Sequence, residues 1–304
     1  MKKFFAGLTA VIVALGLTGC ASAPKEWSRG TGEISIVATT NVWADLAYQI
    51  GGSAVTANAI IYNVNQDPHS FEASARDQLL INEADLVITN GGGYDDFMTT
   101  MLDARTSAVE QLDAVEVAGT DETGNEHIWL DVERVRIVAA EIAARIKAIE
   151  PSVAAEIDSN LAVANTKLDR ILAAQKQIQT ERGGTKVLQL DPLSHYVVKG
   201  VGFVDLTPAS ALAAIESDSE ITPTDMKLME ELLKSGQIKI AIVNASGTTS
   251  QTEKLLSVNY SAANLGLSEL LEQDPDTFEY TGDFFTYLEG AAKSLGWVLD
   301  TDGN

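Results

Sequence analysis

Residues 33–62, EISIVATTNVWADLAYQIGGSAVTANAIIY, decide the fold class of this chain. Residues 33–38 alternate and then become wholly apolar, which is typical of a buried strand. Residues 43–50 have the apolar spacing of a helix, and the glycine pair that follows them would end it. Residues 55–62 then have the composition of a second strand. A strand, a helix and another strand in this order predict a βαβ unit with parallel strands.

The same alternation continues along the rest of the chain. Further strands are predicted at residues 85–89, 112–117, 186–190 and 238–243. Further helices are predicted at residues 75–84, 95–102, 131–149, 151–180, 196–201, 224–233, 251–256 and 283–295. We therefore expect an α/β protein of two lobes, each with a mainly parallel sheet flanked by helices, joined by a long interdomain helix. The predicted boundaries are 33–150 for the N-terminal lobe, 151–182 for the linking helix and 183–304 for the C-terminal lobe.

The first residues have the pattern of an export signal. Two lysines precede residues 4–17, which are almost wholly apolar or small but too short for a permanent membrane span. Leu17-Thr18-Gly19-Cys20 follows and resembles the lipobox of bacterial lipoproteins, in which the cysteine becomes the lipidated first residue. We therefore predict a signal peptide at 1–19, lipidation of Cys20, a flexible tether at 20–32 and an extracytoplasmic position, anchored to the cell membrane. A plain signal peptide with an incidental cysteine is the alternative.

The composition narrows the possible functions. The chain has 304 residues and a formal net charge of −22, which repels nucleic acid and disfavours an anionic lipid surface. Such a charge is compatible with cation capture, and equally with plain solubility outside the cell. Cys20 is the only cysteine, so the mature chain has no disulfide framework, no thiolate metal site and no cysteine nucleophile.

The three histidines of the chain occupy comparable places. His69, His127 and His195 each lie on a loop just before a predicted helix, and His69 and His195 also follow predicted strands. Ligands of open α/β sheets bind at the carboxyl ends of the strands. A single loop histidine is usually structural or exposed, but three at this side of the sheets indicate a binding site. Imidazole nitrogen together with carboxylate oxygen is a suitable ligand set for zinc or manganese.

Two of these histidines lie in motifs that resemble those of a known family. Asp67-Pro68-His69-Ser70-Phe71-Glu72 resembles the Asp-Pro-His-x-(Phe/Tyr)-Glu motif of the zinc- and manganese-binding solute-binding proteins of ABC importers, the TroA-like group. Asn125-Glu126-His127-Ile128-Trp129-Leu130-Asp131 is similar to that family's Asn-Pro-His-x-Trp-Leu-Asp motif, with Glu126 in place of proline. The resemblance covers essentially the whole mature chain and is looser in the second lobe.

The resemblance implies one cation held by four side chains between the two lobes. His69 and His127 match the first two ligands. The third ligand is usually His or Glu after the first strand of the second lobe, where this chain has Asp191, and His195 is a rival four residues further on. The fourth is an Asp or Glu late in the chain, and Glu269 in Leu267-Ser268-Glu269-Leu270 fits best.

Other polar residues of the second lobe match the family less closely. Asn244, at a predicted strand end, is either a supporting residue of the site or an ordinary strand-terminating residue. The remaining late carboxylates, Asp274, Asp276 and Asp283, fit the fourth position less well than Glu269.

The implied function is capture of a divalent metal ion as a transported ligand, and its delivery to an ABC permease, by a monomeric lipoprotein that is not an enzyme. Two imidazoles with two carboxylates, and the absence of histidine from residues 73–126, favour manganese, although zinc also accepts carboxylates. Two other classes stay open. One is an adhesin or scaffold lipoprotein with a degenerate metal site, and the other is a cell-envelope metallohydrolase with Glu126 or Asp131 as general base.

Overall fold

The computed structural model describes residues 27–64, 66–105, 107–217, 219–245, 249–258, 262–272 and 282–301. The predicted signal peptide, Cys20 and most of the predicted tether lie outside these residues, as do Asp274 and Asp276. Over the described ranges, the structure has no helix with the length and apolar character needed to cross a membrane.

The first sheet has five strands in the order β1-β3-β2-β4-β5. Their bounds are β1 Ser28–Gly30, β2 Ile34–Thr40, β3 Val55–Ile61, β4 Leu86–Thr89 and β5 Glu110–Asp113. Neighbouring strands from β3 to β5 pair in parallel, while β1 pairs antiparallel with β3 at the edge. The parallel pairing confirms the βαβ unit predicted from residues 33–62.

The edge strand β1 lies in the segment that was predicted to be a flexible tether. Trp27 is buried, its carbonyl accepts a hydrogen bond from the backbone of Ala59, and Ser28–Gly30 pairs with β3. Buried aromatic area and ladder hydrogen bonds together order the chain before residue 33. The prediction of a tether over 20–32 is therefore wrong for residues 28–30. The small and charged residues around Trp27 are typical of a tether and gave no sign that this side chain is buried.

The helices of the first lobe follow the predicted order. They are α1 Asn41–Gly51, α2 Ala75–Glu83, α3 Phe97–Asp103, α4 Ala114–Ala118 and α5 Val132–Ile149, with short 3-10 turns η1 Gly52–Ala54, η2 Pro68–Ser70 and η3 Ile128–Leu130. One prediction is wrong in part, because the strand expected over 112–117 ends at Asp113 and α4 begins at once. The Asp113 carboxylate accepts the backbone N–H of Glu116 and so caps this helix.

The second sheet has four parallel strands in the order β7-β6-β8-β9. The strands are β6 Lys186–Gln189, β7 Val204–Asp205, β8 Ile240–Asn244 and β9 Ala263–Leu267. The helices around it are α7 His195–Gly200, α8 Ala209–Glu216, α9 Pro223–Lys234, α10 Ser250–Leu256 and α11 Phe284–Thr301, with the turn η5 Pro192–Ser194. The sequence predicted neither β7, which has two residues, nor α8 and β9.

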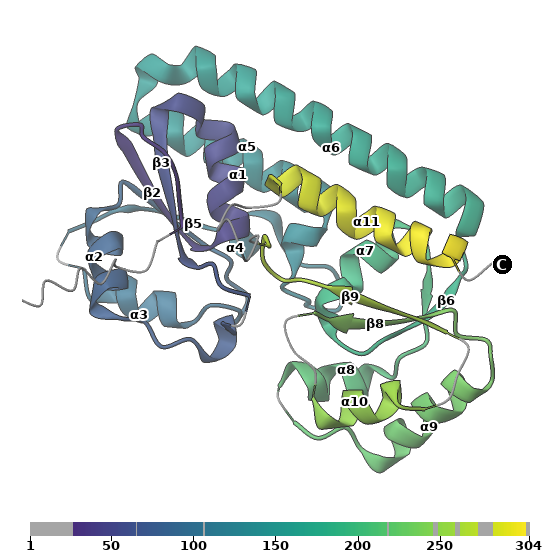
Figure 1. The fold of residues 1–304 in the computed structure, drawn as a ribbon. Helices are drawn as coiled ribbons and strands as arrows, with labels where there is room; N and C mark the ends of the chain where they lie inside the picture. The colour runs from purple at the N-terminus through teal and green to yellow at the C-terminus, as the bar shows by residue number, and fades with distance from the viewer. Residues whose placement is uncertain are drawn as a thin grey trace, which may run out of the picture.

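A long helix connects the two lobes, as predicted. After the turn η4 Pro151–Val153, α6 Ala154–Arg182 runs for 29 residues, which corresponds to about 43 Å. Figure 1 shows α6 passing over both lobes, with α11 beside it. The helix packs against α1 and α5 of the first lobe and against α7 and α11 of the second. One buried apolar cluster contains residues from both sheets and from α6, so the lobes share a core.

A buried carboxylate joins α1 to α11. Asp45 of α1 is fully buried, forms an ion pair of 2.7 Å with Arg29 of β1, and accepts the backbone N–H of Phe284 at 2.7 Å. Burial raises the pKa of Asp45 to about 6, against the opposing effect of Arg29. Nearby, Lys167 of α6 pairs with Asp283 at 2.8 Å. The first turn of α11, in the second half of the chain, is therefore capped by a residue of the first lobe.

Candidate metal centre

The polar residues of the centre all lie beyond the carboxyl ends of parallel strands, at the side where the two lobes face each other. His69 follows β3, Tyr94 follows β4, and Glu126 and His127 follow β5 and α4. Asp191 follows β6, Glu216 ends the helix after β7, Asn244 ends β8, and Glu269 follows β9. This is the edge at which open α/β sheets bind ligands. The fold therefore brings together residues from 69 to 269 in the chain.

The loop of His69 is fixed by its own sequence. The Asp67 carboxylate accepts the backbone N–H of His69 at 3.0 Å and the hydroxyl of Ser70 at 2.7 Å, and Pro68 is buried at the start of η2. The imidazole remains 35% exposed and packs edge-on against Tyr94. The motif thus holds the backbone rigidly while leaving the ring accessible from solvent.

The imidazole of His127 is buried and held in one tautomer. Its Nδ1 lies 3.1 Å from Asn125 Oδ1, which also accepts the backbone N–H of His127. A carbonyl oxygen can only accept, so Nδ1 carries the proton and Nε2 keeps its lone pair, as a metal ligand requires. Burial lowers the pKa of His127 to about 4, so the ring is neutral at pH 7.

The loop before His127 is also tied to the second lobe. Asn125 donates from Nδ2 to the carbonyl of Pro192 at 2.9 Å, and its own carbonyl accepts the hydroxyl of Tyr196 at 2.7 Å. These bonds connect residues of the first lobe to η5 and α7. The loop that carries Glu126 and His127 therefore bridges the two lobes directly.

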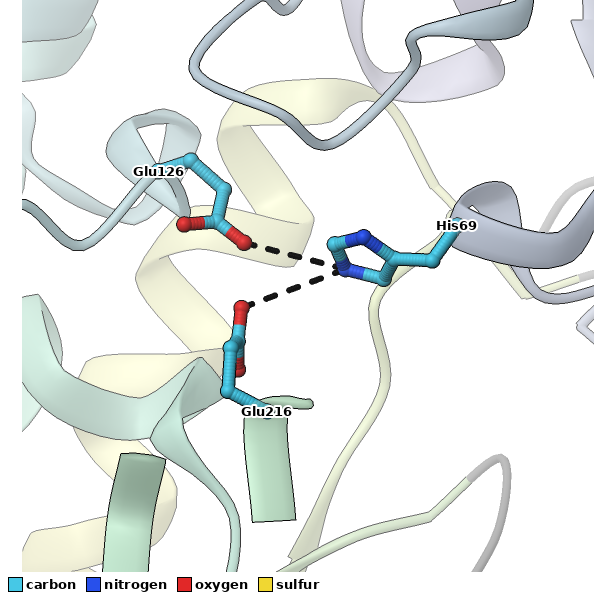
Figure 2. A group of neighbouring side chains, drawn as sticks. All are labelled: His69, Glu126 and Glu216. Carbon is cyan, nitrogen blue, oxygen red and sulfur yellow. Dashed lines mark ion pairs between the residues drawn. The ribbon is translucent and has the colours of Figure 1, made fainter. Parts of the chain in front are cut away.

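Two glutamates meet His69 in a compact cluster (Figure 2). His69 Nε2 lies 3.7 Å from Glu126 Oε1 and 3.9 Å from Glu216 Oε1, and one ligand atom from each residue lies within 4.8 Å of the other two. Metal–ligand bonds to nitrogen and oxygen are about 2.0–2.2 Å long, so two ligands of one ion are separated by at most about 4.4 Å. The cluster is thus close to the spacing that a single divalent cation needs.

The two glutamates are hydrogen-bonded to each other, and this contact favours the protonated form of Glu216. Burial, together with the hydrogen bond and the negative charge of Glu126, raises the pKa of Glu216 to about 10. Burial also opposes ionisation of Glu126, but the hydrogen bond from Glu216 and the nearby His127 lower its pKa overall. Glu216 is therefore the protonated partner near pH 7, and a cation that bound both carboxylates would displace this proton.

Asp191 and Glu269 form the part of the centre contributed by the second lobe alone. Asn244 donates to Glu269 Oε1, and a hydrogen bond from Asn244 also lowers the pKa of Asp191. Tyr94 donates to Glu269 Oε2 at 3.3 Å from the opposite lobe. Burial and the charge of Asp191 raise the pKa of Glu269 to about 7, and burial raises that of Asp191. Both carboxyl groups therefore resist ionisation, and a cation bound between them would stabilise their ionised forms.

Of the four ligands predicted from the sequence, His69 lies in the compact cluster, whereas His127, Asp191 and Glu269 lie around it. Within the described part of the chain, only His69, Glu126 and Glu216 bring three potential ligand atoms within 4.8 Å of one another. His127, Asp191 and Glu269 surround this cluster closely enough to shift the pKa values of its members or of one another.

His195, the rival third ligand, is engaged elsewhere in the structure. Its Nε2 lies 2.7 Å from Asp121 Oδ2, which also receives Lys199 at 2.6 Å. Burial would raise the pKa of Asp121, but the hydrogen bonds from His195 and Lys199 lower it well below its usual range. In this structure Nε2 of His195 therefore faces an ionised carboxylate.

Two carboxylates considered at the sequence level have other partners. Asp131, nominated as a general base, caps α5 by accepting the backbone N–H groups of Glu133 and Arg134, and it pairs with the Arg134 side chain. Asp283 pairs with Lys167. Asp131 is therefore explained by its role as a helix cap, and Asp283 by its ion pair with α6.

Sequence reasoning missed Glu216 as a member of the centre. It lies in Ile215-Glu216-Ser217-Asp218-Ser219, an acidic stretch that resembles any exposed loop in a chain with 43 acidic residues. The two-residue strand β7 before α8 also has no periodicity that could place it. The one available signal was Glu126, an extra acid in a family motif that normally has proline there.

Comparisons with known proteins agree with this architecture. A family model described as zinc-uptake complex component A, periplasmic, matches residues 36–295. The manganese ABC transporter substrate-binding lipoprotein PsaA of Streptococcus pneumoniae serotype 4 is 28% identical over 271 residues, covering 81% of this chain and 83% of the relative. The manganese ABC transporter substrate-binding lipoprotein scaA of Streptococcus gordonii is 26% identical over the same coverage.

Solved structures share the fold at lower sequence identity. The solute-binding protein FpvC of Pseudomonas aeruginosa, determined in complex with Mn2+, superposes with a TM-score of 0.70 at 17% identity, covering 89% of this chain and 99% of that protein. The laminin-binding protein Lmb of Streptococcus agalactiae has a TM-score of 0.71 at 17% identity, covering 88% and 99%. Because the family model spans both lobes and the helix between them, the chain belongs to the periplasmic zinc-uptake complex component A family.

Proposed function

We propose that this protein captures a divalent transition-metal ion between its two lobes and delivers it to an ABC permease. The observation that carries the proposal is the convergence of imidazole nitrogens and carboxylate oxygens from both lobes, with His69 and His127 on one side and Asp191, Glu216 and Glu269 on the other. Membership of a family of transport components, and relatives named as substrate-binding lipoproteins, support the same role.

We assign the final binding set to His69, His127, Asp191 and Glu269. His127 already presents a neutral nitrogen, and Asp191 and Glu269 lie beside each other with Asn244 bonded to both. Asn244 acts as a supporting residue because it orients the carboxylates without being a ligand itself. A transport site can fill its coordination positions with protein side chains, whereas a catalytic metal keeps one position open for water.

Manganese is the cargo that the ligand chemistry favours. The centre contains two imidazoles and at least two carboxylates, and oxygen-rich sets suit manganese better than sets dominated by imidazole or thiolate. The two relatives quoted above are named as substrate-binding lipoproteins of manganese ABC transporters. Zinc binds the same ligand types, so selectivity is a question of relative affinity.

We further propose that the protein acts as a monomer held near its permease by lipid on Cys20. The sequence around Cys20 resembles a lipobox, and the relatives quoted above are lipoproteins. Residues between Cys20 and the first described residue, Trp27, would provide the connection to the folded domain. Labelling with radioactive palmitate in a bacterial host, with C20A as the matched control, tests the anchor.

Metal analysis and titration calorimetry of the purified mature chain with Mn2+ and Zn2+ test the capture role. We expect one tightly held ion per chain and a loss of affinity of more than about 100-fold in H69A and in H127A. D191N should lose affinity similarly, whereas H195A should keep it, because His195 is paired with Asp121. If H69A and H127A bind metal as tightly as the parent, the proposal is wrong, and an adhesin or scaffold role becomes the better explanation.

A further inference from the structure

A cavity of about 490 Å3 opens beside the metal centre and is lined by both lobes. Its walls include Asn125 and Glu126 from the first lobe and Pro192, His195 and Glu216 from the second. Glu126 and Glu216 belong to both the cavity wall and the cluster with His69. The cavity therefore leads directly to these two carboxylates.

We infer that His69, Glu126 and Glu216 form a separate outer cation station, which receives the ion from this cavity before it passes to His127, Asp191 and Glu269. The inference rests on the proposed capture function and adds an entry step to it. The ligand of the outer station is a hydrated divalent cation of the first transition row, with manganese favoured by its two carboxylates and single imidazole. His69 belongs to both sets, so it would stay bound to the ion while the ion exchanges its other ligands.

The geometry of the outer set supports an ion-binding role. The separations of 3.7 Å and 3.9 Å from His69 Nε2 to the two carboxylates lie within the range for ligands of one ion. The Glu216 carboxyl group is hydrogen-bonded to Glu126, but its Oε1 atom is buried and accepts no hydrogen bond from the described residues. A buried carboxyl oxygen that accepts no hydrogen bond is costly, and a cation that displaced the proton of Glu216 would coordinate it.

Exposure distinguishes two of the three outer residues, His69 and Glu216, from the inner histidine, while Glu126 is buried like His127. The side chains of His69 and Glu216 are 35% and 30% exposed, whereas His127 as a whole is 3% exposed. An ion held by three protein ligands at the cavity would complete its coordination with water and exchange readily. An ion among buried ligands exchanges more slowly because it must shed this water. The ion would therefore enter at the outer station beside the cavity and then move to the buried inner set.

One residue of the outer station, Glu126, departs from the motif of the resembling family. Glu126 occupies a motif position at which the resembling family has proline, and its backbone is held by a hydrogen bond from Asn90 to its carbonyl. Glu216 ends α8, the helix that follows β7, whereas Asp191 and Glu269 directly follow β6 and β9. Two acids from opposite lobes therefore face one histidine at this position.

Manganese binding by a chain whose inner set is disabled provides the test. In D191N/E269Q, we expect one Mn2+ to bind at least about 100-fold more weakly than in the parent. Adding E216Q or E126Q should weaken this residual binding by a further tenfold or more. Adding H69A should abolish it, whereas adding H127Q should leave it unchanged, because His127 belongs only to the inner set. E231Q, a 63% exposed glutamate of α9, is the matched control and should have no effect.

Pulsed electron paramagnetic resonance of bound Mn2+ gives a second readout. The residual ion in D191N/E269Q should couple to one imidazole nitrogen, and the ion in the parent to two. In the otherwise unchanged chain, E216Q should slow the loading rate about tenfold in stopped-flow mixing while final affinity changes less. Thermal melts check that each variant is folded.

The outcomes separate the two proposals. If the parent binds no Mn2+, the capture function itself fails. If the parent binds Mn2+ but residual binding in D191N/E269Q is absent, or does not respond to E216Q, only the outer station is wrong. Unchanged loading kinetics in E216Q would likewise overturn the entry role and leave capture intact.

Discussion

Replacing Asp45 with asparagine should remove a pH dependence from the folding stability of the protein between about pH 4 and 6. Asp45 is fully buried between β1, α1 and α11, with Arg29 as its ion-pair partner. Burial raises its pKa from 3.8 to about 6 in the folded chain. Lys167 and Asp283 are the other charged groups that act on it, and they shift its pKa in opposite directions.

The sign and size of the effect follow from proton linkage. Below about pH 4 the carboxyl is protonated in both the folded and the unfolded states, so its full contribution is present. Between about pH 4 and 6 the unfolded chain loses this proton first, which stabilises the unfolded state, so the contribution is lost as the pH rises. A shift of about two pKa units corresponds to about 3 kcal/mol.

Denaturant unfolding of metal-free protein between pH 4 and 7.5 measures this contribution. The free energy of unfolding of the parent minus that of D45N should fall by about 3 kcal/mol over this range. D158N, which removes an exposed carboxylate of α6 paired with Lys147, is the control and should change the profile by less than about 1 kcal/mol. A parent-minus-D45N difference that stays constant with pH, or a carboxyl resonance of Asp45 that titrates near pH 4, would refute the reasoning.

Three further predictions concern packing, backbone and ligand. Trp129 is fully buried, so W129A should cost about 3–5 kcal/mol of unfolding free energy. W129F loses the hydrogen bond to Tyr287 and only part of the buried ring, so it should cost less, about 1–2 kcal/mol, and equal losses in the two variants would contradict this account. Gly91 has φ +76° and a Cβ there would lie 2.1 Å from an oxygen of Asp113, so G91A should destabilise more than G124A, at φ +77° in open space, as denaturant midpoints would show. Mn2+ at 1,000 times its dissociation constant should add about 4 kcal/mol to the free energy of unfolding. If the melting temperature measured with Mn2+ does not change when a chelator is added, the ion does not bind the folded state.

The sequence predicts the parts of this protein that are encoded locally. Residues 33–62 contain a complete βαβ unit, and the motifs around His69 and His127 contain both the proposed ligand and the residues that hold its loop, such as Asp67 and Asn125. Each of these interactions spans only a few residues. Periodicity and short motifs are therefore sufficient to find them.

The parts that the sequence does not predict depend on contacts between distant segments. Strand β1 exists because Trp27 is buried and Ser28–Gly30 meets β3, about 28 residues later in the chain. Glu216 joins His69 only through the packing of the two lobes, 147 residues apart, and nothing in its neighbours indicates that contact. An acidic surface and an acidic ligand have the same composition, so only the three-dimensional structure distinguishes them.

The stiffness of helix α6 bears on which metal ions the proposed site would accept. If the proposed ligands from the two lobes hold one ion, a change in metal–ligand bond length would be accommodated in part by a change in the angle between the lobes, which share α6 and α11. Such a change would bend α6, a helix of about 43 Å, or slide it against its neighbours. Binding of an ion with an unsuitable radius would then cost elastic energy in a helix that does not touch the ion. Substitutions along the buried side of α6 would alter the discrimination between metals as surely as substitutions among the ligands.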